Sequence, residues 1–168
     1  MAKPTVFKGR FAASIDGDMV VFLIGARVNK PWKLRTMKTV AGAMTAMQKE
    51  LRAHPELGCL HIENYGALRN ISVQYWRSFE HLERYARSSD QRHLPAWRAF
   101  NKAVADNGDV GIWHETYCVA AGQMEAVYGN MPRCGLAQAG EHHPAGRAST
   151  AARRVGVLPD DEAPVAAY

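Results

Sequence analysis

The spacing of apolar positions changes along the chain and predicts alternating strands and helices. Residues 19–28 (MVVFLIGARV) are apolar on both alternating faces, which is typical of a strand covered on both sides. After the break at Asn29-Lys30-Pro31, apolar side chains from residue 33 to 54 recur at three- and four-residue steps, which predicts a helix with one apolar face. These apolar positions are Leu34, Met37, Ala41, Met44, Met47 and Leu51.

Two strands, a helical region and a last strand follow. Residues 58–65 and 70–76 predict a hairpin, and Ser78 is placed to cap the start of a helix. A second short helix is expected from about residue 94 to 105, before a strand over residues 110–119. The order β-α-β-β-α-(α)-β is that of an α+β, ferredoxin-like sandwich.

A chain of 168 residues has material for one ordinary core. We expect this domain to cover residues 1–137, with residues 1–18 as an N-terminal arm. From residue 138 the sequence is rich in Ala, Gly, Pro and Arg and has few large apolar side chains. Burial could not offset the entropy of ordering such a segment, so residues 138–168 are predicted to be a flexible tail.

Composition excludes several classes of protein. The formal charge of +5 comes from scattered Lys and Arg residues with Asp and Glu nearby, and no nucleic-acid motif accompanies them. The three cysteines have neither a disulfide pattern nor zinc-ligand spacing, which suits a reducing cytoplasm. The longest apolar run is too short to cross a membrane, so we expect a cytoplasmic protein without nucleic-acid or membrane partners.

Aromatic, imidazole and carboxylate groups recur inside apolar segments between residues 73 and 117. Buried polar groups need partners or a ligand, so this region predicts a pocket. His114 and Glu115 are neighbours on the last predicted strand and must point to opposite faces. One of them is a candidate catalytic base; Glu115 could equally be paired with Arg77 or Arg98 in an interface.

Other side chains are candidates for binding a planar, apolar substrate by stacking and hydrogen bonding. They are Tyr75, Trp76, Trp97, Trp113 and Tyr117. Arg77 could hold an anionic intermediate and Asn29 could steady an oxyanion, although Arg77 could also be an exposed charge beside the helix cap. The absence of GxGxxG, P-loop, HExxH and GxSxG patterns argues against nucleotide-binding, zinc-protease and hydrolase functions, and leaves flavin open.

Five segments carry a resemblance to a known family: VVFLIGARVNKPWK, VQYWRSFEHLERYA, HLPAWRAFN, VGIWHETY and VYGNMPRCGL. They resemble the monooxygenase family related to the enzyme of fumagillin biosynthesis, a branch of the dimeric α+β barrels of the antibiotic-biosynthesis-monooxygenase type. The resemblance implies a ferredoxin-like homodimer with a pocket between sheet and helices. In the wider superfamily that pocket serves cofactor-independent oxygenation of aromatic or polyketide substrates, or binds haem through a histidine in the helical region.

The resemblance places His93 first among the candidates, because it opens the helical segment before Trp97. Its imidazole could relay a proton or ligate iron, or could simply donate to a backbone carbonyl. Trp97 lies about one helical turn after His93, so we expect both to converge with His114 or Tyr117 on one cavity.

We therefore predict a monooxygenase that oxidises a small hydrophobic, aromatic or polyketide-like substrate with dioxygen and without a cofactor or metal. One alternative is a haem enzyme of the same fold, an oxygenase, peroxidase or aldoxime-dehydratase-like protein, with His93 or His114 as axial ligand. Another is a non-catalytic dimer that binds a small ligand. A homodimer is expected because the first strand is apolar on both faces, and helices cover only one face of such a sheet.

Overall fold

The computed structural model describes residues 3–66, 69–88, 108–145 and 155. The chain divides into two compact units. The large unit is Val20–Tyr117, and the small unit combines Met1–Met19 with Cys118–Tyr168. None of the helices in these described stretches is long and apolar enough to cross a membrane.

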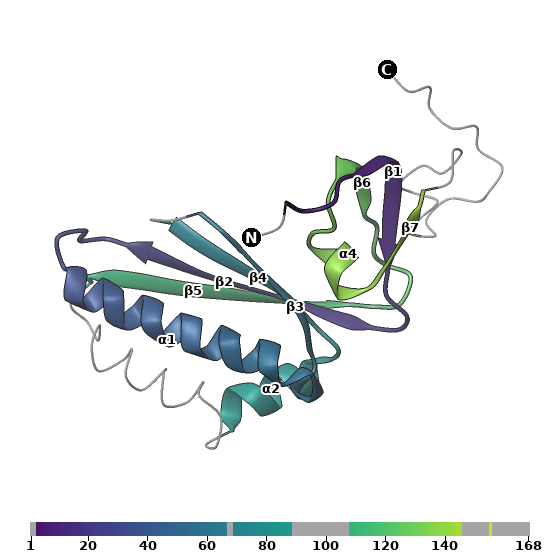
Figure 1. Ribbon diagram of the computed structural model, residues 1–168. Coiled ribbons are helices and arrows are strands. Elements are labelled where there is room, and N and C mark those ends of the chain that lie inside the picture. Colours follow the sequence, from purple (N-terminus) through teal and green to yellow (C-terminus); the bar gives the residue numbers. More distant parts are fainter. Residues whose placement is uncertain (1–2, 67–68, 89–107, 146–154, 156–168) are drawn as a thin grey trace. The chain divides into compact units, whose positions relative to one another are not determined.

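The large unit contains a four-stranded sheet with the strand order β3-β4-β2-β5. Its elements are β2 (Met19–Val28), α1 (Leu34–Ala53), the 3-10 turn η1 (Pro55–Leu57), β3 (Cys59–Tyr65), β4 (Arg69–Trp76), α2 (Phe79–Arg87) and β5 (Val110–Val119). The pairs β2–β4 and β3–β4 are antiparallel. Both α1 and α2 lie on one side of the sheet (Figure 1). This arrangement confirms the predicted α+β, ferredoxin-like fold, and β2 and β5 have the predicted bounds.

The ends of the helices follow from local sequence. Ser78 caps α2: its side-chain oxygen accepts a hydrogen bond from the His81 backbone N–H, and Glu80 in the first turn favours the positive end of the helix dipole. Gly58 joins η1 to β3 with φ of 89°, a left-handed conformation that glycine adopts without a steric penalty. A Cβ at this position would also collide with the His81 ring, so both the backbone conformation and the lack of space favour glycine here.

The core of the large unit lies between the sheet and its helices. Its buried members are Val20, Leu51, Cys59, Ile62, Trp76, Leu82 and Tyr85. Trp76 is fully buried and its ring centroid lies 5.8 Å from that of Tyr85, which joins β4 to α2. The predicted apolar face of α1 is present at Met37, Met44, Met47 and Leu51, whereas Leu34, which is 69% exposed, and Ala41 face solvent.

The small unit is a three-stranded sheet with the order β6-β1-β7. Its elements are β1 (Phe7–Ser14), β6 (Val127–Met131), α4 (Leu136–Ala139) and β7 (Glu141–Pro144). Strand β1 pairs antiparallel with both neighbours. Regular structure therefore occurs inside the segment expected to be an arm and continues past the predicted start of the tail at residue 138. The sequence pattern missed this because β6 and β7 have only five and four residues, too few to show a period.

Candidate functional site

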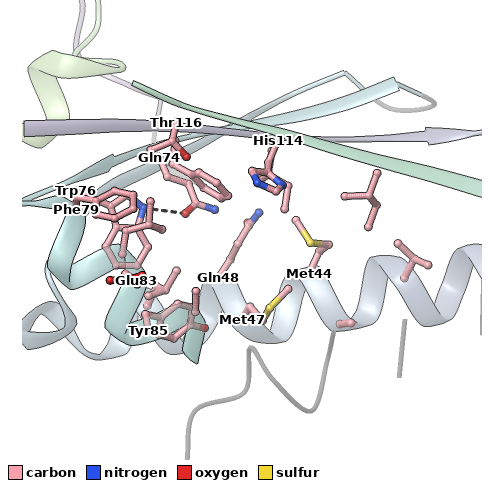
Figure 2. Close-up of a pocket in the computed structure, with 18 residues that line it drawn as sticks. Met44, Met47, Gln48, Gln74, Trp76, Phe79, Glu83, Tyr85, His114 and Thr116 are labelled. Atoms are coloured by element: carbon pink, nitrogen blue, oxygen red, sulfur yellow. Dashed lines mark hydrogen bonds between the residues drawn. The ribbon is translucent and has the colours of Figure 1, made fainter. Parts of the chain in front are cut away.

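A cavity of about 340 Å³ lies between α1, α2 and the covered face of the sheet. Strands β2, β4 and β5 contribute alternate residues to it, as the two-residue period of a strand requires. Its lining is mostly apolar and includes Phe22, Ile24, Met44, Met47, Leu51, Trp76, Phe79, Leu82, Tyr85 and Ile112. The polar lining residues are Gln48, Gln74, Glu83, His114 and Thr116. Figure 2 shows His114 and Thr116 descending from β5 toward the side chains of α1.

Gln74 is held in one orientation by Trp76. The Trp76 indole N–H donates to Gln74 Oε1 at 3.0 Å, and both residues are buried. Because an indole nitrogen can only donate, this contact fixes which end of the Gln74 amide faces Trp76. The amide nitrogen consequently points away from Trp76, on the side where His114 lies (Figure 2). Gln74 thus presents a donor to the cavity.

Gln48 enters the same space from α1. Its amide exchanges two hydrogen bonds with Asn64 of β3: Gln48 Nε2 donates to Asn64 Oδ1 at 2.9 Å, and Asn64 Nδ2 donates to Gln48 Oε1 at 2.8 Å. A longer contact of 3.4 Å joins Gln48 Nε2 to Oγ of Ser72, which is fully buried. These partners satisfy a buried amide that would otherwise be costly, and they hold Gln48 as a fixed wall of the cavity.

Among the histidines that the structure describes, His114 lines this cavity. Its ring centroid lies 5.6 Å from that of Phe22, and its side chain remains exposed to solvent. An imidazole exchanges protons near neutral pH. His114 therefore combines contact with an apolar cavity and access to water, which is what a general base needs.

Glu115 and three aromatic candidates lie on the opposite face of the sheet. The Tyr117 hydroxyl donates to Glu115 Oε2 at 2.6 Å, and this hydrogen bond raises the pKa of Tyr117. The Trp113 ring lies against Gly25 of β2, where a Cβ would collide with it. Tyr75 stacks on His61 with ring centroids 6.4 Å apart. The structure thus separates these residues from the cavity that His114 and Trp76 share, and the reason is the alternation of neighbours along β4 and β5.

The remaining candidates do not line the cavity or lie outside the described residues. Asn29 is exposed, and its backbone N–H donates to the carbonyl of Asp109 at 2.9 Å. Arg77 is exposed at the end of β4, and its backbone N–H donates to the Gly58 carbonyl at 2.9 Å. His93 and Trp97 belong to residues 89–107, which the structure does not describe.

Sequence reasoning missed the two glutamines. Gln48 falls on the apolar stripe of α1, one residue after Met47 and four after Met44, and Gln74 alternates with Ser72 and Trp76 on one face of β4. A polar residue at a position that periodicity assigns to the core was the available signal.

The thiol of Cys59 lies in the buried core of the large unit. Burial raises the pKa of Cys59 to about 12, so its thiol stays protonated and is a poor nucleophile. Among the described residues, no group of three or more His, Cys, Asp and Glu side chains is arranged to hold a metal ion.

Fold and site together define an α+β protein with an apolar cavity between a ferredoxin-like sheet and its helices. The chain belongs to the monooxygenase af470-like family, whose model matches residues 19–136. It is 28% identical over 146 residues to monooxygenase af470 of Aspergillus fumigatus, with 74% of this chain and 52% of that protein covered. The chain thus spans about half the length of the curated relative it matches.

Solved structures with similar folds include an aldoxime dehydratase in complex with butyraldoxime. It has a TM-score of 0.61 and 17% identity, and the match covers 79% of this chain and 42% of that one. SnoaB of Streptomyces nogalater, a cofactor-independent oxygenase, matches with a TM-score of 0.40 and 12% identity, covering 60% of this chain and 91% of its own. A dimeric protein of ferredoxin-like fold from Bacteroides fragilis has a TM-score of 0.42 and 15% identity, covering 59% of this chain and 94% of its own.

Proposed function

We propose that this chain is a monooxygenase that oxidises a small, planar hydrophobic substrate in the cavity beneath the sheet. The observation that carries the proposal is the convergence of His114 and Gln74 on an apolar cavity in a member of a monooxygenase family. The cavity volume of about 340 Å³ lies at the lower end of the range for small-molecule sites, which suits a compact aromatic ring system.

The proposed reaction needs a ketone substrate with an acidic C–H, whose tautomer is a phenol or enol. His114 accepts this proton, and the enolate passes an electron to dioxygen before the two recombine as a hydroperoxide. Loss of water from the hydroperoxide leaves a carbonyl, so that R₂CH₂ + O₂ gives R₂C=O + H₂O. The substrate supplies all of the electrons, one oxygen atom enters the product, and the other leaves as water.

The other cavity residues support this chemistry through position. The Gln74 amide N–H can donate to the enolate oxygen, and the bond from Trp76 keeps that donor from turning away. A fixed donor of this kind stabilises developing negative charge without reorganisation. The lining around the bound ring is mostly apolar, and a hydrogen bond to a developing anion is stronger in such surroundings than in water.

Haem is the second candidate, and the observation that favours it is the position of His114. One imidazole against an apolar cavity is a sufficient donor set for non-covalent haem, and His114 would be the residue that binds its iron. The bound group would then activate dioxygen or a peroxide. The two candidates differ in colour: a Soret band that His114→Ala removes from the purified protein supports haem, and a protein active without such a band supports the cofactor-free reaction.

Anthrone, a tricyclic ketone whose tautomer is a phenol, is a suitable test substrate. We expect the purified protein to consume one dioxygen per anthrone and to place one atom from ¹⁸O₂ in the product. Ile112→Trp provides a control, because a larger side chain would fill the cavity. Protein that binds anthrone but consumes no dioxygen, with or without added haemin, would contradict the monooxygenase function and leave a ligand-binding module.

We also propose a homodimer that covers the open face of the sheet. Trp113 and Tyr117 on this face are 42% and 48% exposed, and exposed aromatic side chains of this size are common at protein interfaces. Light scattering should give the mass of two chains at micromolar concentration. Trp113→Asp should yield monomers, whereas Trp32→Asp, which changes a tryptophan that is 71% exposed ahead of α1, should not. A monomeric wild-type protein would refute the dimer.

A further inference from the structure

A second cavity, of about 480 Å³, lies beside the first one along α1. Its lining comes from β2, α1, β3, β4 and the start of β5: Ala26, Val28, Met37, Lys38, Val40, Ala41, Met44, Thr45, Gln48, Asn64, Asn70 and Val110. Three of these residues, Val40, Met44 and Gln48, also line the first cavity. They are spaced four residues apart and so form one stripe of the helix, along which the two cavities meet.

The two cavities differ in chemistry. The first is walled almost entirely by apolar groups, and its acidic residue Glu83 is paired with Arg87 at 2.8 Å. The second contains the hydroxyl of Thr45, the amides of Asn64 and Asn70, and the ammonium of Lys38. No Asp or Glu occurs among its described lining residues, and no described carboxylate forms an ion pair with Lys38. The second cavity therefore carries a net positive charge beside neutral hydrogen-bonding groups.

The boundary between the cavities is rigid on its polar side. Gln48 is held by Asn64 and Ser72, so the amide groups form a fixed edge between an apolar compartment and a polar one. Because this edge is fixed, it favours ligands in which the boundary between the apolar and the polar part lies at the same place. A ligand that satisfies both compartments must be apolar at one end and anionic or strongly polar at the other.

We propose that the two cavities form one elongated binding site for an amphipathic aromatic substrate. The ring system occupies the first cavity beside His114, and an anionic substituent such as a carboxylate reaches the second, where Lys38 is its cation and Asn70 a further polar partner. This proposal rests on the proposed function, because it names the substrate class of the same site. Lys38 would then determine specificity without taking part in the oxidation.

Two fluorescent probes of the same shape test this arrangement. Anilinonaphthalene sulfonate and N-phenyl-1-naphthylamine share an aromatic skeleton, and only the first carries an anion. We expect Lys38→Met to weaken binding of the sulfonate roughly tenfold, the loss typical of one charge-assisted hydrogen bond, and to leave binding of the amine within about twofold. Lys49→Met is the matched control: it removes the same charge from an exposed position of α1 that lines neither cavity, and should change neither affinity.

Equal losses of sulfonate binding in Lys38→Met and Lys49→Met would show a general charge effect and overturn the proposal, as would no loss in either. Ile112→Trp should abolish binding of both probes, since it fills the first cavity; binding that survives there would place the probes elsewhere and also overturn it. None of these binding measurements involves turnover. If His114→Ala retains full oxidation while Lys38→Met discriminates between the probes, the proposed mechanism fails and the elongated site stands.

Discussion

Two histidines, one in each unit, lie against aromatic rings in opposite circumstances. His114 of β5 faces Phe22 at the edge of a cavity and is exposed to solvent. His142 of β7 lies in the small unit with its ring centroid 4.6 Å from Phe11, 4.8 Å from Phe7 and 5.8 Å from Tyr128. Both of its ring nitrogens are buried and find no hydrogen-bond partner in the described part of the chain.

The difference shows that surroundings, rather than residue type, separate candidate chemistry from packing. An imidazole can transfer protons only if a substrate or water reaches its nitrogens. His114 meets this condition, whereas His142 serves as a flat packing surface between strands. Burial lowers the pKa of His142, and the nearby cations Arg133 and His143 lower it further. The surroundings of His142 thus favour its neutral form.

The largest expected effect is on turnover. His114→Ala should lower kcat on anthrone by about 10²- to 10⁴-fold, the usual contribution of a positioned base. His142→Phe should leave kcat within about twofold, because it retains an aromatic ring at a position that does no chemistry. Steady-state dioxygen uptake measures both. An equal loss of kcat in the two variants would contradict the different roles assigned to His114 and His142.

Stability should show the reverse order. His142→Ala removes a ring from the aromatic cluster and should lower the free energy of opening of the small unit by about 2 kcal/mol, whereas His142→Phe should preserve or raise it because no unpaired nitrogens remain buried. Hydrogen exchange of the β1 and β7 amides measures this directly. His114→Ala should leave these amides unchanged, and a loss there as large as that of His142→Ala would contradict the assignment.

Chemical modification tests accessibility itself. Diethyl pyrocarbonate acylates neutral imidazole nitrogens that solvent can reach. His114 should therefore react at least roughly tenfold faster than His142, because a buried imidazole reacts only after the structure opens locally. Peptide mass spectrometry after short exposures follows each histidine separately. His143, which neighbours His142 in sequence, is the internal reference. Equal rates for His142 and His114 would show that the aromatic cluster is open.

The smallest effect concerns pH. An unfolded histidine has a pKa near 6.5, and the folded value for His142 is lower, so between the two values the unfolded chain binds more protons. Stability of the small unit should therefore be complete above pH 6.5 and fall as the pH drops through that value, with no further loss from His142 below its folded pKa. Hydrogen exchange at pH 7.5 and 5.5 should show this loss in wild-type protein and a smaller one in His142→Phe, which isolates His142 from Glu141 and His143. Identical pH dependence in both proteins would refute it.

Local sequence determined the large unit to a useful degree. The continuous apolar run of residues 19–28 and the three- and four-residue steps of α1 reflect which faces of each element are buried, and residue type alone carries that information. The Ser78 cap was readable because it joins groups three residues apart. The separation of His114 from Glu115 was equally local, because adjacent residues of a strand point to opposite faces of the sheet.

Tertiary structure alone decided the small unit and the identity of the cavity residues. Strand β1 pairs with β6 and β7, which lie more than 110 residues away in sequence, and no local pattern encodes such pairing. Gln48 meets Asn64 only once α1 packs on the sheet, whereas the hydrogen bond between Gln74 and Trp76 joins residues two apart on one face of β4. Which face of β5 borders a cavity depends on where the helices lie, so the sequence could name His114 and Glu115 as candidates but only the packing of α1 and α2 could choose between them.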